Sequence, residues 1–290
     1  MRQQLRVAIF FRKMNLLINT LALFLLWATY SCSPSAAPQS AFAPAKLAVT
    51  YIANEGVLIS SGDKQVLIDG LHRKYNPDYA FPPEALLKSL ESAQPPYDRL
   101  RLILVSHLHL DHFHPVSVGL HLQNNKAAVL VSSDQIADGI KEGFDAYGEI
   151  EPRVRRVAYE WKKRVVINAN GIDIKVLGLR HGGPQFGWVQ NLGYVVSLNG
   201  RKILHIGDAD MTQENFSTFN LAQEGIDVAF IPYWFFFSSD GRSIVREQIR
   251  PKYVVAVHIP PAEAEEVSKQ IKAVYPEAIM LTKILETKAF

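Results

Sequence analysis

The sequence predicts an α/β fold in which two β-rich halves lie face to face. Strands alternate with helices in the first half, a set of hairpin strands follows, and the alternation then returns, which indicates layered sheets and helices. The chain has 290 residues, of which 48% are hydrophobic and 20% are charged, enough for one large domain with an extensive core. The formal net charge of +3 is small for this length, so we expect no nucleic-acid partner.

The first half begins with three short apolar runs that are typical of strands, at residues 47–52, 56–60 and 65–68. The turn at 61–64 contains Gly and Asp and predicts a hairpin between the second and third runs. Alternating helices and strands follow. We expect helices at 82–90, 116–122 and 134–142, and strands at 100–105 and 127–131.

The second half opens with strands that are joined by hairpin signals. Asn170-Gly171 and Asn199-Gly200 are typical of two-residue turns between antiparallel strands. We expect strands at 155–159, 164–167, 172–177, 193–198, 202–206, 227–232, 253–258 and 278–281, with a helix at 261–274.

The N-terminal segment has the features of an export signal. Basic residues end at Lys13, an apolar run covers 16–28, and the only cysteine, Cys32, follows small residues. This resembles a bacterial lipoprotein signal, in which the cysteine becomes lipidated. We therefore expect a signal peptide at 1–31, a flexible tether at 32–45 and one domain at 46–290, in an exported, periplasmic or membrane-anchored protein. Ordinary cleavage further on and an uncleaved anchor are the alternatives.

A cluster of potential metal ligands directly follows the strand at 100–105. His107, His109, Asp111 and His112 lie within six residues, and in an extended chain the first three point to one side. Imidazole and carboxylate are common zinc ligands, and the single cysteine leaves no thiolate set as an alternative. The pattern predicts a metal site, the other interpretation being a surface turn that binds metal adventitiously.

Three later ligand-type residues also stand at strand ends beside Gly or Pro: His181, Asp208 and His258. Ligands at the edge of a rigid sheet form a preorganised site. Asp69-Gly70 ends another buried run, where Asp69 is equally a turn residue or a site residue. His205, three residues before Asp208, is expected to point away, and His72 and His121 are interpreted as surface or helix residues.

Together these residues resemble, in type and order, the ligand pattern of the metallo-β-lactamase superfamily, over residues 46–285. The resemblance implies a four-layer αββα sandwich. It assigns His107, His109 and His181 to one metal and Asp111, His112 and His258 to a second. It makes Asp208 the bridge between the metals, and it places Asp69 outside the ligand set, where it orients a motif histidine or its loop.

The resemblance also implies a reaction, in which a hydroxide bridging two Zn²⁺ ions attacks an ester-like bond. Mn²⁺ or Fe also suits these ligands. Asp111 and Asp208 would be the catalytic residues, and Asp111 could carry a proton to the leaving group. Gly207-Asp208-Ala209-Asp210 resembles the lactonase, thioesterase and phosphodiesterase branches, so we expect a phosphodiester or lactone substrate. A β-lactam or thioester hydrolase and a metal-containing binding domain are the alternatives.

Aromatic residues surround the expected site in the sequence. The run 233–237, which begins with Tyr233, is interpreted first as packing under a loop and second as an apolar pocket wall or a membrane-facing lip. Trp188 and His114 are further candidates for the pocket. With a lipid anchor at Cys32, a lipid-like substrate would be within reach, beside small-molecule substrates.

Overall fold

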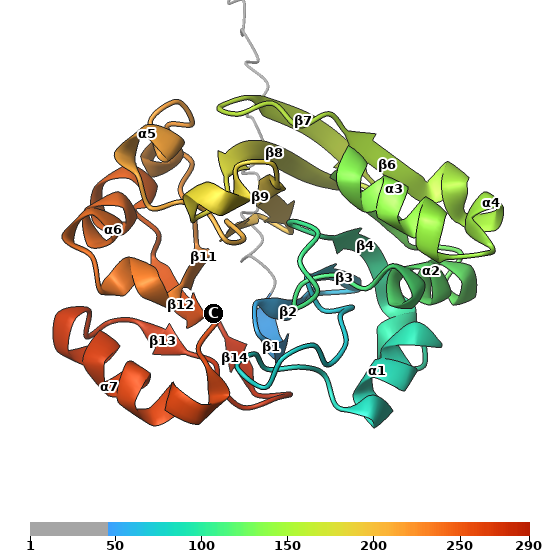
Figure 1. Ribbon diagram of the computed structural model, residues 1–290, viewed down its shortest axis with the longest axis horizontal. Coiled ribbons are helices and arrows are strands. Elements are labelled where there is room, and N and C mark those ends of the chain that lie inside the picture. The colour runs from blue at the N-terminus through green and yellow to red at the C-terminus, as the bar shows by residue number, and fades with distance from the viewer. Residues whose placement is uncertain (1–45) are drawn as a thin grey trace, which may run out of the picture. The chain divides into compact units, whose positions relative to one another are not determined.

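The computed structural model describes residues 46–290, and Figure 1 shows two facing sheets with helices on their outer sides. This is the predicted α/β sandwich. The expected signal peptide at 1–31 and tether at 32–45, with Cys32, lie outside the described residues. Within the described part, no helix has the length and apolar character that crossing a membrane requires.

The first sheet has the strand order β14-β1-β2-β3-β4-β5-β6. The strands β1, β2 and β3 form an antiparallel meander, which contains the predicted hairpin between β2 and β3, while β3, β4, β5 and β6 are parallel neighbours. The unpredicted β14 returns from the C-terminus to pair with β1. The strand bounds are β1 Leu47–Ala53, β2 Gly56–Ser61, β3 Lys64–Ile68, β4 Leu100–Leu104, β5 Val129–Ser133, β6 Val154–Val157 and β14 Thr287–Ala289.

The second sheet has the strand order β13-β12-β11-β10-β9-β8-β7. The two Asn-Gly turns connect β7 to β8 and β9 to β10 as antiparallel hairpins, and all four turn residues have positive φ, as such turns require. The strand bounds are β7 Arg164–Ala169, β8 Ile172–Arg180, β9 Gln190–Leu198, β10 Arg201–His205, β11 Val228–Pro232, β12 Tyr253–Val257 and β13 Ile279–Met280.

Helices cover the outer face of each sheet. In Figure 1 the helices α1 to α4 lie beside the first sheet and α5 to α7 beside the second. The side chain of Ser133 accepts a hydrogen bond from the Ile136 N–H and so caps α3, which covers the helix predicted at 134–142. The helix bounds are α1 Glu84–Glu91, α2 Pro115–Asn124, α3 Asp134–Gly143, α4 Tyr147–Ile150, α5 Gln213–Phe216, α6 Ser239–Ser243 and α7 Ala264–Val274.

The core is divided into three apolar layers by the alternation of strand side chains. In β4, Leu102 and Leu104 face the opposite sheet, while Ile103 faces the helices. In β12, Val255 faces the first sheet and Val254 faces the helices. Both faces of these strands are buried, which is why they appear in the sequence as continuous apolar runs rather than as alternating patterns.

The topology brings the motif loops to one edge of the sandwich. The strands β3 and β4 of the first sheet are parallel, as are β10, β11 and β12 of the second, so the strands within each set end on the same side. The two sheets are joined there by the hydroxyl of Tyr194, which donates to the carbonyl of Val105 over 2.6 Å. The segments that follow β3, β4, β10 and β12 carry Asp69, the 107–112 motif, Asp208 and His258.

Candidate metal centre

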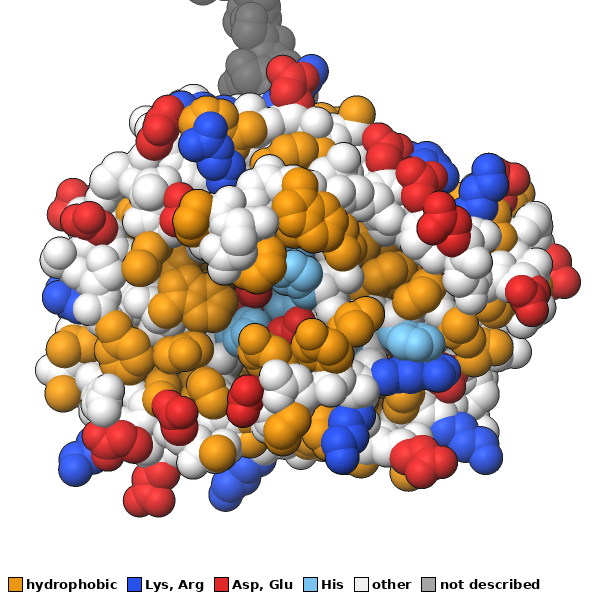
Figure 2. All heavy atoms as spheres, in the orientation of Figure 1, with side chains coloured by type: hydrophobic (Ala, Val, Ile, Leu, Met, Phe, Trp, Pro, Cys, Tyr) orange, Lys and Arg blue, Asp and Glu red, His pale blue; other side chains and the backbone are white. Residues whose placement is uncertain are grey.

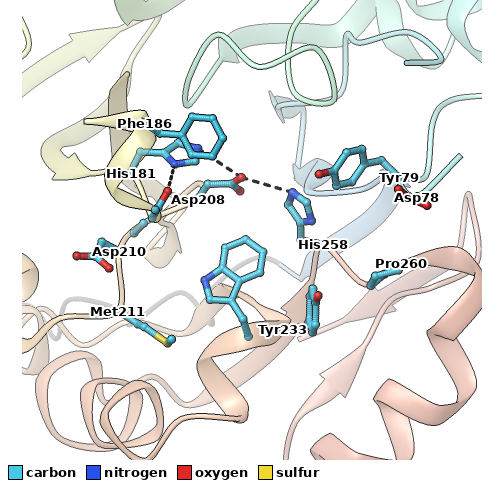
Figure 3. A pocket seen from close by; sticks show the side chains of 14 residues that line it. Asp78, Tyr79, His181, Phe186, Asp208, Asp210, Met211, Tyr233, His258 and Pro260 are labelled. Atoms are coloured by element: carbon cyan, nitrogen blue, oxygen red, sulfur yellow. Dashed lines mark hydrogen bonds and ion pairs between the residues drawn. The ribbon is translucent and has the colours of Figure 1, made fainter. Parts of the chain in front are cut away.

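Two groups of ligand atoms converge at this edge. In one group His107, His109, His181 and Asp208 each offer an atom within 4.8 Å of the others, and in the second Asp111, His112 and His258 do so. Asp208 also contacts the second group: its Oδ1 lies 3.4 Å from His112 Nε2 and its Oδ2 lies 3.5 Å from His258 Nε2. Figure 3 shows this carboxylate between His181 and His258.

The spacing of these atoms fits a metal ion. Ligand atoms about 2.0–2.2 Å from a tetrahedral zinc ion lie roughly 3.3–3.6 Å apart. Asp208 Oδ2 is 3.5 Å from His181 Nε2 and 3.8 Å from His107 Nε2, and Asp111 Oδ2 is 3.3 Å from His258 Nε2.

Hydrogen bonds aim the ring nitrogens of the motif at the centre. Asp69 Oδ2 accepts from His112 Nδ1 over 3.0 Å and from the Ser106 hydroxyl over 2.5 Å, while its Oδ1 accepts from the Ser106 N–H over 2.7 Å. The same hydroxyl lies 2.9 Å from His107 Nδ1 and can accept its proton. With Nδ1 protonated in both rings, His107 and His112 present bare Nε2 atoms.

His181 and His109 are directed in the same way. Nδ1 of His181 donates to the carbonyl of Gly182 over 2.6 Å, and its buried Nε2 has no hydrogen-bond partner among the described residues. Nδ1 of His109 lies 3.1 Å from Nε2 of His107. Because the latter nitrogen is bare, a cation between the two rings would satisfy both. Nε2 of His258 and Oδ1 of Asp208 are likewise buried without a hydrogen-bond partner in this part of the chain.

The electrostatic surroundings favour neutral imidazoles in the group that contains His107 and His109. They favour a positive charge in the group that contains His258, beside Asp111 and Asp208. Burial, with His181 nearby, lowers the pKa of His109 to about 4, and burial with His112 holds the pKa of His107 well below its usual range. Burial opposes protonation of His258 as well, yet Asp208 and Asp111 outweigh it and raise its pKa to about 10. The second group therefore attracts a positive charge that a metal ion can supply.

Backbone conformation is unusual at three positions of the centre. Asp69 and His258 have φ of 48° and 61°, a left-handed conformation that costs side-chain-bearing residues about 1–3 kcal/mol and is frequent at functional sites. Gly207 has φ of 54°, and a Cβ there would lie 2.4 Å from Asn191 Oδ1 and 2.8 Å from Ser106 Cβ. Only glycine lets the loop before Asp208 approach the loop before His107 this closely.

Two further residues belong to the surroundings of the centre and were missed by the sequence reasoning. Asn54 donates to Asp111 Oδ2 over 2.9 Å. Glu55 is buried, and its carboxylate forms candidate ligand groups with His112 and Asp208 and with Asp69 and His205. The sequence feature that could have indicated them is their position: Asn54 and Glu55 are two polar residues between the buried strands β1 and β2.

The remaining histidines agree only in part with their expected places. His205 was expected to point away, but its ring is buried beside Glu55, with Nε2 3.2 Å from the Glu55 carbonyl. His72 and His121 are fully buried rather than on the surface, although His121 does lie in α2. His114 caps α2 by accepting from the Ser117 N–H, and it does not line the pocket described next.

A pocket of about 470 Å³ opens above the candidate metal ligands His181, Asp208 and His258. Figure 2 shows histidine and carboxylate atoms at the bottom of a hollow that hydrophobic side chains surround. The aromatic run divides: Tyr233 and Trp234 line the pocket, while the next two residues are buried in the core. Trp188 is 61% exposed and lies outside the lining.

Comparison with known proteins agrees with this fold. Residues 66–282 match the family model described as "Beta-lactamase superfamily domain", so the chain belongs to this superfamily. Two similar curated proteins are UPF0173 metal-dependent hydrolases. The one from Thermus thermophilus is 30% identical over 72% of this chain and 82% of its own length, and the one from Symbiobacterium thermophilum is 26% identical over 72% and 83%.

Among solved structures, Igni18, a metallo hydrolase from Ignicoccus hospitalis, superposes with a TM-score of 0.56. The two are 16% identical, and the match covers 84% of this chain and 98% of the other, which supports the metallo-β-lactamase fold. The chain is thus a metal-dependent hydrolase of this superfamily.

Proposed function

We propose that the protein is an exported hydrolase with a binuclear zinc centre that cleaves an ester-like bond, a lactone or a phosphodiester. The observation that carries the proposal is the position of Asp208. Its two oxygens lie 3.4–3.5 Å from ring nitrogens of both ligand groups, as a carboxylate shared by two metal ions requires. Zinc suits the nitrogen and oxygen donors, and manganese or iron remains compatible with them.

The bound metal ions would acidify a water molecule and stabilise the oxyanion that develops on the substrate. The residues of the chain have supporting tasks. Asp111, which accepts from Asn54 Nδ2 over 2.9 Å, is held beside His258 and is placed to pass a proton to the leaving group. Asp69 keeps the motif imidazoles in the tautomer that binds metal.

The metal content of the purified full-length chain tests the binuclear centre. We expect about two metal ions per chain by mass spectrometry, and a clear loss in the Asp208→Ala variant. Asp210→Ala is the matched control, because Asp210 lines the same pocket but belongs to neither ligand group. One ion in the wild type, or full occupancy in Asp208→Ala, would contradict the bridging role.

A β-lactam or thioester substrate is the competing proposal. Hydrolysis of a chromogenic cephalosporin or of an acyl thioester by the metal-loaded protein, at rates above those with lactones and phosphodiesters, would favour it.

Export and membrane attachment are proposed from residues 1–45 alone. The apolar run at 16–28 and Cys32 support a lipoprotein signal. Expression in a bacterial host with labelled palmitate is expected to give a labelled, membrane-associated product whose label is lost in Cys32→Ala. An unlabelled, soluble wild-type product in the cytosol would refute the proposal.

A further inference from the structure

Within residues 46–290, the pocket over the metal centre has neither Lys nor Arg in its lining. Besides the ligand candidates His181, Asp208 and His258, the lining includes two further carboxylates, Asp78 and Asp210. Arg180 lines a neighbouring hollow that shares His181, Gly183 and Asp210 with this pocket, and its guanidinium stacks 3.4 Å from the Trp161 ring centroid. Phosphate and carboxylate groups on ligands are usually bound by such cations, so apart from the metal ions that the centre would hold, the lining offers no cation to select an anionic substituent.

Aromatic rings flank the centre on both sides. The Phe186 ring lies 4.8 Å from His109 and 5.0 Å from His181, and thus covers the first ligand group. Tyr79 and Trp234 lie edge-on to His258 at 5.3 Å and 5.1 Å and cover the second. Figure 3 shows Phe186 and Tyr79 on opposite sides of Asp208. A substrate that reaches the metal ligands therefore has apolar walls on either side of its reacting bond.

A second hollow of about 250 Å³ extends this apolar surface. It shares Tyr79 and Phe186 with the first pocket and adds Tyr75, Leu108 and Leu110. Its lining contains no Lys or Arg either, within the described part of the chain. The two hollows adjoin at Tyr79 and Phe186, and the second also touches His109 and Asp111, so substituents on both sides of a scissile bond can be accommodated.

We propose that the substrate is an uncharged carboxylic ester or lactone with an apolar group on each side of the scissile bond, and that anionic substrates are disfavoured. This inference rests on the proposed hydrolase function and narrows it. In the reaction, the oxygen of water bonds to the carbonyl carbon and the acyl–oxygen bond breaks. The alcohol leaves with one proton, and the acid is released as a carboxylate and a second proton. The carboxylates of Asp78 and Asp210 add repulsion against anions at the pocket walls.

Three chromogenic substrates test the proposal with the metal-loaded full-length protein. Para-nitrophenyl octanoate and the para-nitrophenyl monoester of suberic acid share the scissile bond and the chain length but differ by one terminal carboxylate. Bis-para-nitrophenyl phosphate represents an anionic phosphodiester. We expect kcat/KM for octanoate to exceed that for suberate by about tenfold or more, the effect of a few unfavourable charge contacts in a partly desolvated pocket.

Two variants locate the effect in the pocket. Asp210→Asn removes one negative charge from the wall, so the suberate-to-octanoate ratio of kcat/KM should rise severalfold. Asp145→Asn makes the same change in charge in the exposed turn before α4, outside both hollows, and should leave the ratio unchanged. Trp234→Ala should reduce the preference for octanoate over acetate, because it removes an apolar wall.

The outcomes separate this inference from the proposed function. If suberate or the phosphodiester is cleaved as fast as octanoate, the inferred selectivity is refuted while the hydrolase remains. The same holds if Asp145→Asn shifts the ratio as much as Asp210→Asn. If no ester of any charge is cleaved by protein with its full metal content, the proposed function itself fails.

Discussion

The side chain of Asp69 is expected to control metal binding without touching the metal. Its Oδ2 accepts hydrogen bonds from His112 Nδ1 and from the Ser106 hydroxyl, so in Asp69→Asn an amide that donates protons can occupy this position. The rotamer of the introduced amide that keeps the Ser106 N–H bond presents its NH₂ group to His112. The imidazole then accepts at Nδ1 and carries its proton on Nε2, the nitrogen that faces Asp208.

The expected loss follows from this change of tautomer. Removing the hydrogen-bond partner of a metal-bound histidine typically weakens metal affinity about 10–100-fold, which corresponds to about 1.4–2.7 kcal/mol. Competition with a chromophoric chelator measures this directly. We expect the group containing His112 to lose affinity most, and kcat/KM at limiting metal to fall in proportion.

A matched variant separates this effect from a general change of charge. Asp173→Asn is suitable, because Asp173 lies on β8, is exposed, and accepts only from Asn168 among the described residues. It should leave both metal affinities unchanged. Wild-type affinity for both metal ions in a folded Asp69→Asn protein would show that the His112 tautomer does not depend on Asp69, and the reasoning would be refuted.

Two further predictions concern stability. Gly207→Ala should lower the free energy of unfolding by about 2 kcal/mol or more, because residue 207 has a left-handed backbone and the added Cβ would collide with the side chain of Asn191. Gly225→Ala, with φ of 68° but no heavy atom within 4 Å of its Cβ, should cost only about 1 kcal/mol in urea denaturation, and equal losses would contradict the steric argument. Burial lowers the pKa of His121 to about 4 from the ordinary 6.5. Between these pH values the imidazole is protonated in the unfolded chain and neutral in the folded chain. The free energy of unfolding should therefore fall as the pH drops from 6.5 towards 4, and His121→Asn should reduce its decrease between pH 7 and pH 5 by about 2 kcal/mol. An undiminished decrease in the variant would assign the pH dependence to other groups.

The fold was predictable because local signals and burial agree along most of the chain. Apolar runs at 100–105 and 253–258 became central strands, and the Asn-Gly turns became hairpins, since their positive φ values match the twist of antiparallel strands. The two-stranded pairing of β14 with β1 was not predictable from pattern. Its residues Thr287–Ala289 are all exposed and form no apolar run, and only the pairing with a distant strand fixes them.

Some residues of the centre could be predicted from the sequence and others could not. In the motif at 107–112 the potential ligands are close together in the sequence. Glu55, in contrast, is a single acidic residue in a two-residue turn, and only the folded chain brings it to His205. Burial raises the pKa of Glu55 well above its usual range, Asp208 adding to the effect, so an ionised Glu55 is costly in this position. A protonated Glu55 would stabilise the loops of both halves by hydrogen bonding, while a charged one would need a cation close by. The sequence cannot distinguish these states, because the deciding quantity is the distance between Glu55 and Asp208, which is set by the pairing of β1 with β2 and the packing of the two sheets.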